Sequence, residues 1–257
     1  MAVVMKRFAL ACTMVLTTLI AAPRAHSSEA TVESWVKVAS TGLDTRALAA
    51  LEQISGANRR LLALRAYLRA GDSLPQRWSW SQRQLADYEY TPEGRAAAAD
   101  IDAVAAEFAA ENPGFTLQVN RQPRSLEQQL SRWNENPGVG RVADSLERSL
   151  LRQFTSTATP NADLVRRALL DWSPSVAAPL AAPGLSAHGQ GRAFDFQIEH
   201  DGTIVAGLEV AYARRDWDAN GWTHKLQHAV SASGRSFSGP LQSPYEPWHY
   251  AYAPQSH

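Results

Sequence analysis

The chain has 257 residues, of which 45% are hydrophobic and 19% charged, a composition typical of a globular protein rather than a disordered one. Basic and acidic residues balance to a formal charge of zero, so no basic excess indicates a nucleic-acid partner. The length allows one domain of moderate size, or a smaller domain with an extension.

The N-terminal residues have the pattern of a secretory signal peptide. Lys6 and Arg7 precede an apolar run over residues 8–22, which is short for a membrane span and contains threonines. Residues 25–27 form a usable cleavage site. We therefore predict that residues 1–27 are removed and that the mature protein is periplasmic or extracellular, at the cell wall, with no stable membrane insertion. An uncleaved anchor is the alternative.

Residues 28–111 are predicted to form a helical N-terminal extension. Leucine and isoleucine recur at helical spacing over residues 48–68, and Gly56 divides this stretch. Trp78 and Trp80 could stack on sugar rings, but packing against the neighbouring helix is the preferred interpretation. The extension shows no chemistry of its own.

A further helix closes this extension. Thr91 is its predicted N-cap and Pro92 its first residue, and Asn112-Pro113-Gly114 ends it. The remaining residues, 112–257, are predicted to form the catalytic domain. A strand over residues 115–120 begins that domain and a helix follows from residue 122.

The catalytic domain is predicted to combine a small antiparallel sheet with packed helices, so the fold class is α+β. Residues 134–140 are predicted to form a loop, followed by helices near 141–154 and 161–172. The alternation over residues 193–198 predicts a strand with three apolar residues in the core and Asp195 on the other face.

Two short stretches, near residues 190 and 247, carry the side chains suited to metal chemistry. His188 and Asp195 lie in the first, and Glu246 and His249 in the second. Two imidazoles, one carboxylate and a water would complete a tetrahedral zinc site with an exchangeable position, as catalytic sites have. Spacing alone does not bring His249 to the same metal. Cys12, the sole cysteine, lies in the predicted signal peptide, so a metal site of the mature chain must use histidines and carboxylates.

The two stretches resemble the signature of a known family. The matching pattern is Ser186-x-His188-x-x-Gly191-x-Ala193-x-Asp195, followed by Glu246-x-Trp248-His249. It is similar to the signature of the zinc D-alanyl-D-alanine carboxypeptidases, which include the vancomycin-resistance-type D,D-carboxypeptidases and dipeptidases. That family shares its fold with lysostaphin-type peptidases and hedgehog domains. The resemblance covers roughly residues 115–252 and leaves residues 28–110 without a counterpart.

The resemblance implies a role for each matching side chain. His188, Asp195 and His249 would bind one zinc ion per chain, and Glu246 would act as the general base. An arginine before a helix would hold the substrate and stabilise negative charge, and Arg124 occupies the corresponding position.

The match around Arg124 is partial, because Gln122-Pro123 stand where the family has Gly-Tyr. Arg121 and Arg141 are therefore rivals for the same role. Ser186 and Trp248 are expected at the substrate-binding site, although Ser186 could equally cap the strand entry.

The function implied is that of a secreted zinc metallopeptidase that hydrolyses peptidoglycan stem peptides, most readily as a D,D-carboxypeptidase. An endopeptidase of the same fold is an alternative. A non-catalytic, zinc-containing cell-wall binding module is another, because hedgehog domains keep zinc and serve in recognition. The sequence leaves the oligomeric state open.

Three other histidines are weaker metal-site candidates. His200 is predicted to lie in a solvated turn. His224 and His228 are four residues apart on a predicted helix, a spacing that can bind metal, but no glutamate adjoins His224 as in zinc-peptidase helices.

Overall fold

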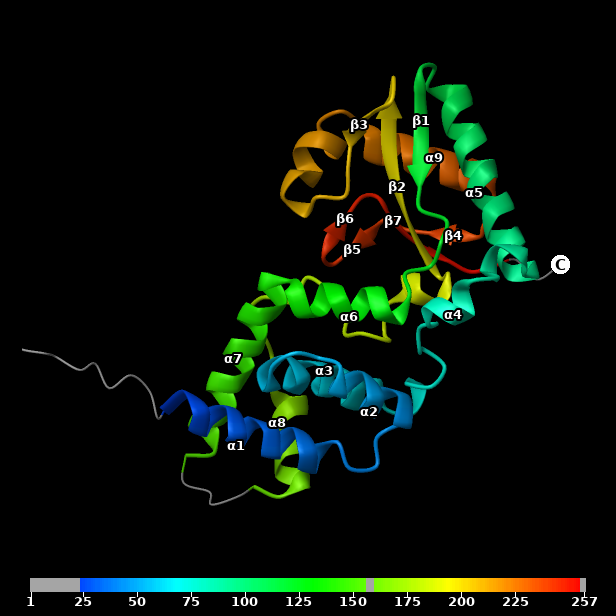
Figure 1. Cartoon of the computed structure of the whole chain (residues 1–257). Coiled ribbons are helices and arrows are strands. Elements are labelled where there is room, and N and C mark those ends of the chain that lie inside the picture. Colours follow the sequence, from blue (N-terminus) through cyan, green and yellow to red (C-terminus); the bar gives the residue numbers. More distant parts are fainter. Residues whose placement is uncertain (1–23, 156–159, 255–257) are drawn as a thin grey trace, which may run out of the picture.

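The computed structural model describes residues 24–155 and 160–254, so most of the predicted export segment lies outside the described residues. Helices and a small antiparallel sheet form two hydrophobic cores, which confirms the predicted α+β class (Figure 1). Within the described residues, no helix is long and apolar enough to cross a membrane.

The first core, here called the helical core, is built mainly from helices and contains no residue of the described strands. Trp78 closes this core and is 7% exposed, with its ring 5.7 Å from that of Tyr67. Gly56, at a φ of 80°, separates the second helix from the third as predicted. The helices of the core are α1 (Arg24–Ala39), α2 (Thr45–Glu52), α3 (Ala57–Ala70), α6 (Leu126–Glu135), α7 (Pro137–Gln153) and α8 (Ala162–Asp171).

The loop predicted over residues 134–140 is wrong. Helix α6 runs to Glu135 and α7 begins at Pro137, so only Asn136 separates them. The Asn136 side chain accepts hydrogen bonds from the backbone N–H groups of Gly138 and Val139. Asparagine as N-cap and proline at the first helical position start a helix here, although the same Asn-Pro-Gly run is common in turns.

The second core, here called the sheet core, lies between an antiparallel sheet and two helices. The sheet order is β1-β2-β7-β4, and β3 pairs with residues 198–200 of β2, on the edge opposite β1. Strands β3 and β7 therefore follow one another along the second edge of β2. The strands are β1 (Phe115–Val119), β2 (Ala193–His200), β3 (Thr203–Ala206), β4 (Phe237–Ser238) and β7 (His249–Tyr252).

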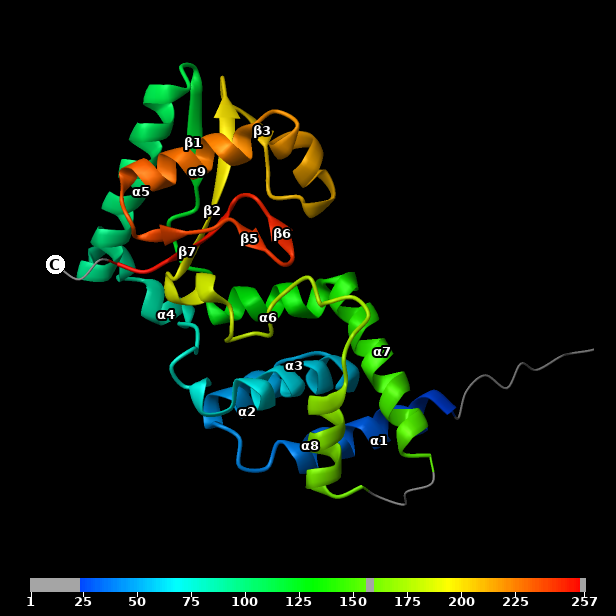
Figure 2. The same cartoon turned by 180° about the vertical axis from the view of Figure 1, so that it is seen from behind.

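Helices α5 (Pro92–Glu111) and α9 (Trp222–Ser233) cover one face of the sheet (Figure 2). The Thr91 hydroxyl accepts a hydrogen bond from the backbone of Gly94, which confirms the predicted cap. The apolar residues of β2, Phe194, Phe196 and Ile198, are at most 2% exposed beneath these helices. The alternate residues of β2 consequently face away from the core, as the period of the strand requires.

Both cores draw on residues from either side of position 111. Helices α1 to α3 pack with α6 to α8, while α5 packs against β1 and α9. Helix α6 lies between the sheet and helices α1, α2 and α3 in both views (Figures 1 and 2). The chain before residue 111 is thus part of both cores.

Candidate metal centre

His188 lies on a single 3-10 turn, Ala187–Gln190, that joins the helical core to β2. Gly191 ends the turn in the left-handed conformation, with a φ of 60°. Position 189 has no room for a side chain, because a Cβ atom there would lie 2.2 Å from the Ser79 hydroxyl oxygen. The two glycines let the chain turn tightly while His188 projects toward the sheet.

Backbone hydrogen bonds from two other segments hold this turn. The amide of Trp80 donates to the carbonyl of Gly189, and the amide of Arg124 donates to the carbonyl of His188, each at 2.9 Å. The buried Gln129 amide donates to the Arg124 carbonyl and accepts from Gly184. The turn is therefore fixed to the N-terminal segment and to the start of α6.

Asp195 and His249 face one another across neighbouring strands. They are register partners in the β2–β7 pair, so their side chains leave the same face of the sheet. Asp195 is 14% exposed and His249 18% exposed. The strand alternation that buries Phe194 and Phe196 thus directs Asp195 to the same point as His249.

The donor atoms of His188, Asp195 and His249 converge and could hold a metal ion. These three residues are here called the metal group. His188 Nε2 lies 3.2 Å from His249 Nδ1 and 3.5 Å from Asp195 Oδ2, and His249 Nδ1 lies 3.1 Å from Asp195 Oδ1. Ligands about 2.0–2.1 Å from a tetrahedral zinc ion would be about 3.3 Å apart. The three donors therefore have both the chemistry and the spacing of such a site, which confirms that a metal could bind here.

The protonation states of two donors suit coordination. Burial lowers the pKa of His188 to about 4, so its imidazole is neutral at physiological pH. Burial opposes ionisation of Asp195, but its contacts with His249, His188 and Arg124 outweigh that cost and leave the pKa below its usual range. A neutral imidazole and an ionised carboxylate are the forms that bind metal.

Glu246 lies beside this group on β6 (Tyr245–Glu246), which pairs with β5 (Leu241–Gln242). Its Oε2 atom is 3.6 Å from His249 Nδ1, and the side chain is 21% exposed. Burial, supported by the charge of Asp195, raises the pKa of Glu246 above its usual value. A carboxylate with a raised pKa beside a metal group is suited to accept a proton.

Arg124 is the predicted arginine that lies at the group. Its guanidinium is 3.5 Å from Asp195 Oδ2, and burial, with the charge of Arg132 next, lowers its pKa. Arg121 is instead ion-paired with Asp102. The other rival, Arg141, lines a separate depression that includes Pro174 and Val176.

The two residues expected to bind substrate, Ser186 and Trp248, make the following contacts. Trp248 is 3% exposed, and its ring packs 6.0 Å from Trp217 in the sheet core. The Ser186 carbonyl accepts hydrogen bonds from the Ser79 hydroxyl and the Gly189 amide. Neither Ser186 nor Trp248 lines the cleft described below.

The three other candidate histidines, His200, His224 and His228, do not join the group. The ring of His200 stacks on Phe115 with centroids 4.5 Å apart. His224 and His228 are exposed on α9, and His228 Nδ1 is 2.8 Å from the carboxylate of Glu111.

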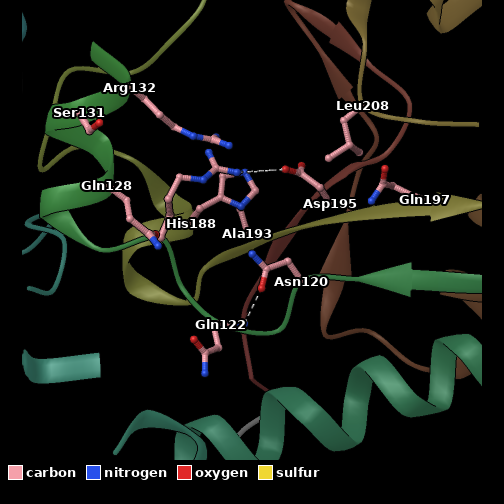
Figure 3. Close-up of a pocket in the computed structure, with 11 residues that line it drawn as sticks. Asn120, Gln122, Gln128, Ser131, Arg132, His188, Ala193, Asp195, Gln197 and Leu208 are labelled. Atoms are coloured by element: carbon pink, nitrogen blue, oxygen red, sulfur yellow. Dashed lines mark hydrogen bonds and ion pairs between the residues drawn. The ribbon is translucent and has the colours of Figure 1, made fainter. Parts of the chain in front are cut away.

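A cleft of about 510 Å³ opens beside His188 and Asp195 (Figure 3). Arg124 and Arg132 are its cationic residues, and most of its other polar lining is amide. Sequence reasoning missed Arg132, although its helical spacing of four from Gln128 places both on one side of α6. The other lining residues are Asn120, Gln122, Gln128, Ser131, Ala193, Gln197 and Leu208.

Comparisons with protein-family models, with curated proteins and with solved structures give no match for this chain.

Proposed function

We propose that the protein is a zinc metallopeptidase that hydrolyses peptidoglycan stem peptides, with D-alanyl-D-alanine carboxypeptidase as its activity. The observation that carries this proposal is the convergence of His188, Asp195 and His249, two of which, His188 and Asp195, line an open cleft. Glu246 and Arg124 lie beside these three residues. The resemblance of the sequence to the zinc D,D-carboxypeptidase family supports the substrate class.

Zinc is the proposed ion because two imidazoles and one carboxylate are a common donor set of catalytic zinc, and the described residues include no cysteine. When bound, zinc supplies Lewis-acid chemistry that polarises a carbonyl and lowers the pKa of a water to about 7. The cleft on the Asp195 side leaves room for a peptide to approach the donor group.

Glu246 and Arg124 would divide the remaining chemistry. Glu246, whose Oε2 atom lies 3.6 Å from His249 Nδ1, would take a proton from the attacking water and pass it to the leaving amine. The Arg124 guanidinium, next to Asp195, would donate hydrogen bonds to the oxygen on which negative charge develops. A module that only bound zinc would need neither group.

The test is incubation of the zinc-loaded protein with defined muropeptides, followed by mass measurement of the products. Loss of one terminal D-alanine is the expected result. Cleavage of cross-links would indicate an endopeptidase. Binding to peptidoglycan without cleavage, by a protein that contains zinc, would contradict the proposal and favour the binding module.

A further inference from the structure

Two guanidinium groups, those of Arg124 and Arg132, line the same cleft. Arg124 ends at the metal group, whereas Arg132 approaches from α6. In Figure 3 the side chain of Arg132 extends from the helix toward His188 and Asp195. The charge of Arg132 acts on Arg124, so the two lie close enough to repel one another. Electrostatic repulsion between two like charges destabilises the fold, and an anionic ligand bound between them would relieve that repulsion.

Arg132 has no acidic partner among the described residues. Arg124 pairs with Asp195, but Arg132 makes no ion pair in this part of the chain. Glu135, one turn further along α6, instead accepts a hydrogen bond from Ser131. Asp195 is the sole acidic residue among the described residues that line the cleft, and it is one of the three candidate metal donors. The cleft lining therefore carries one positive charge without an acidic partner in the described chain, that of Arg132, among side chains that are mostly amides.

A peptide substrate carries two negative charges while its C-terminal peptide bond is hydrolysed. One develops on the scissile carbonyl oxygen, and the other is the permanent carboxylate of the leaving residue. Consecutive Cα atoms are about 3.8 Å apart, so the two charges lie within one residue of each other. Arg124, beside the metal group, can stabilise the first charge, and Arg132, in the lining of the same cleft, is available to bind the second.

We propose that Arg132 binds the free terminal carboxylate of the substrate and thereby selects C-terminal over internal peptide bonds. This inference rests on the proposed peptidase function. A planar guanidinium can hold a carboxylate through two parallel hydrogen bonds. An internal peptide bond offers only neutral groups here, so it leaves Arg132 unpaired. Arg132 is thus a specificity-determining residue.

The experiment compares one N-acylated peptide ending in D-alanyl-D-alanine as the free acid and as the C-terminal amide. Arg132→Gln is expected to lower kcat/KM for the acid roughly 10- to 100-fold, mainly through KM, with little change for the amide. Arg132→Lys should recover part of the loss. Arg141→Gln, which also removes an arginine but lines another depression, is the control and should behave like wild type.

An equal loss for acid and amide, or no loss for either, would overturn the assignment of Arg132. A second measurement does not need turnover. In the zinc-loaded Glu246→Gln protein, calorimetric titration should show that the acid binds more tightly than the amide, and addition of Arg132→Gln should abolish the difference. If the wild type cleaves neither peptide, the proposed function fails, while this binding difference still decides the role of Arg132.

Discussion

Glu246 is the residue that can distinguish an enzyme from a metal-binding module, because it is a carboxylate beside the metal group and not one of its three donors. Glu246 lies 3.6 Å from His249 Nδ1, and His188, Asp195 and His249 could together provide the three protein ligands of the proposed zinc. Under that proposal, Glu246 can be changed without removal of a ligand.

Glu246→Gln is expected to leave zinc content and melting temperature nearly unchanged while hydrolysis is almost abolished. The substitution keeps the size and hydrogen bonding of the side chain but removes the proton acceptor. General bases contribute about 10²- to 10⁴-fold in rate, or roughly 3 to 5 kcal/mol of barrier. Zinc analysis, a thermal melt and a peptide hydrolysis assay measure the three properties. Loss of zinc would make Glu246 a ligand, and unchanged turnover would remove it from the mechanism.

His188→Ala and His249→Ala are each expected to reduce zinc binding, because each removes one of three converging donors. Metal content after dialysis, measured by elemental analysis, provides the readout. His224→Ala is the matched control, since that histidine is exposed on α9 away from the group. Full zinc retention in a double variant of His188 and His249 would refute the metal site.

Arg124→Ala is expected to leave zinc in place and to reduce kcat, because the guanidinium would stabilise charge that develops during the reaction. Loss of one such donor typically costs about 10²- to 10³-fold in kcat. Arg141→Ala should have no effect. The reverse pattern, measured with the same peptide, would show that the arginine is misassigned.

At the scale of elements, the turn Ala187–Gln190 determines whether the ligands meet. Its position depends on the close approach of Gly189 to Ser79 and Gln129, and on the amides of Trp80 and Arg124. The described part of the chain before residue 111 therefore helps to position a candidate metal ligand, through the Trp80 amide and the packing of Ser79.

Gly189→Ala is expected to destabilise the fold by about 1 to 3 kcal/mol, as overpacking of a well-packed site does. Zinc affinity should fall with it, because the turn must shift away from Ser79. Gly207→Ala is the control, since the nearest side-chain atom to a Cβ there is 3.6 Å away. Denaturant unfolding with and without zinc provides the measurement. Equal stability of the two variants would show that the turn is not tightly packed.

The elements differ in how far local sequence predicts them. The alternation of β2 predicted which side of the strand Asp195 occupies, and Thr91 with Pro92 predicted the start of α5, because both signals act over a few residues. The meeting of His188 with His249 depends on the β2–β7 register, which spacing does not reveal. Arg132 was missed because a helix position does not show which cleft it faces.

At the scale of the whole molecule, the candidate ligands come from both cores. His188 lies on a turn bonded to segments that pack in the helical core, whereas Asp195 and His249 belong to strands of the sheet core. A bound ion would therefore join the two cores as well as serve the reaction.

Chelation of the ion is accordingly expected to lower the stability of the entire chain. A ligand present at a hundredfold excess over its Kd stabilises the folded state by about 2.7 kcal/mol. A melting experiment with and without a chelator should show a lower Tm for the metal-free protein. The His188→Ala protein should give the same Tm in both conditions, and a response equal to wild type would place the metal elsewhere.

The origin of the ligands in two cores also has a consequence for how the chain unfolds. Two separate hydrophobic cores can unfold as partly independent units, and a shared ion would couple their unfolding. Scanning calorimetry of the zinc-loaded protein should then give a van't Hoff enthalpy equal to the calorimetric enthalpy. After removal of the ion, the van't Hoff value should fall below the calorimetric one. The ion would thus confer cooperativity on unfolding in addition to a higher midpoint.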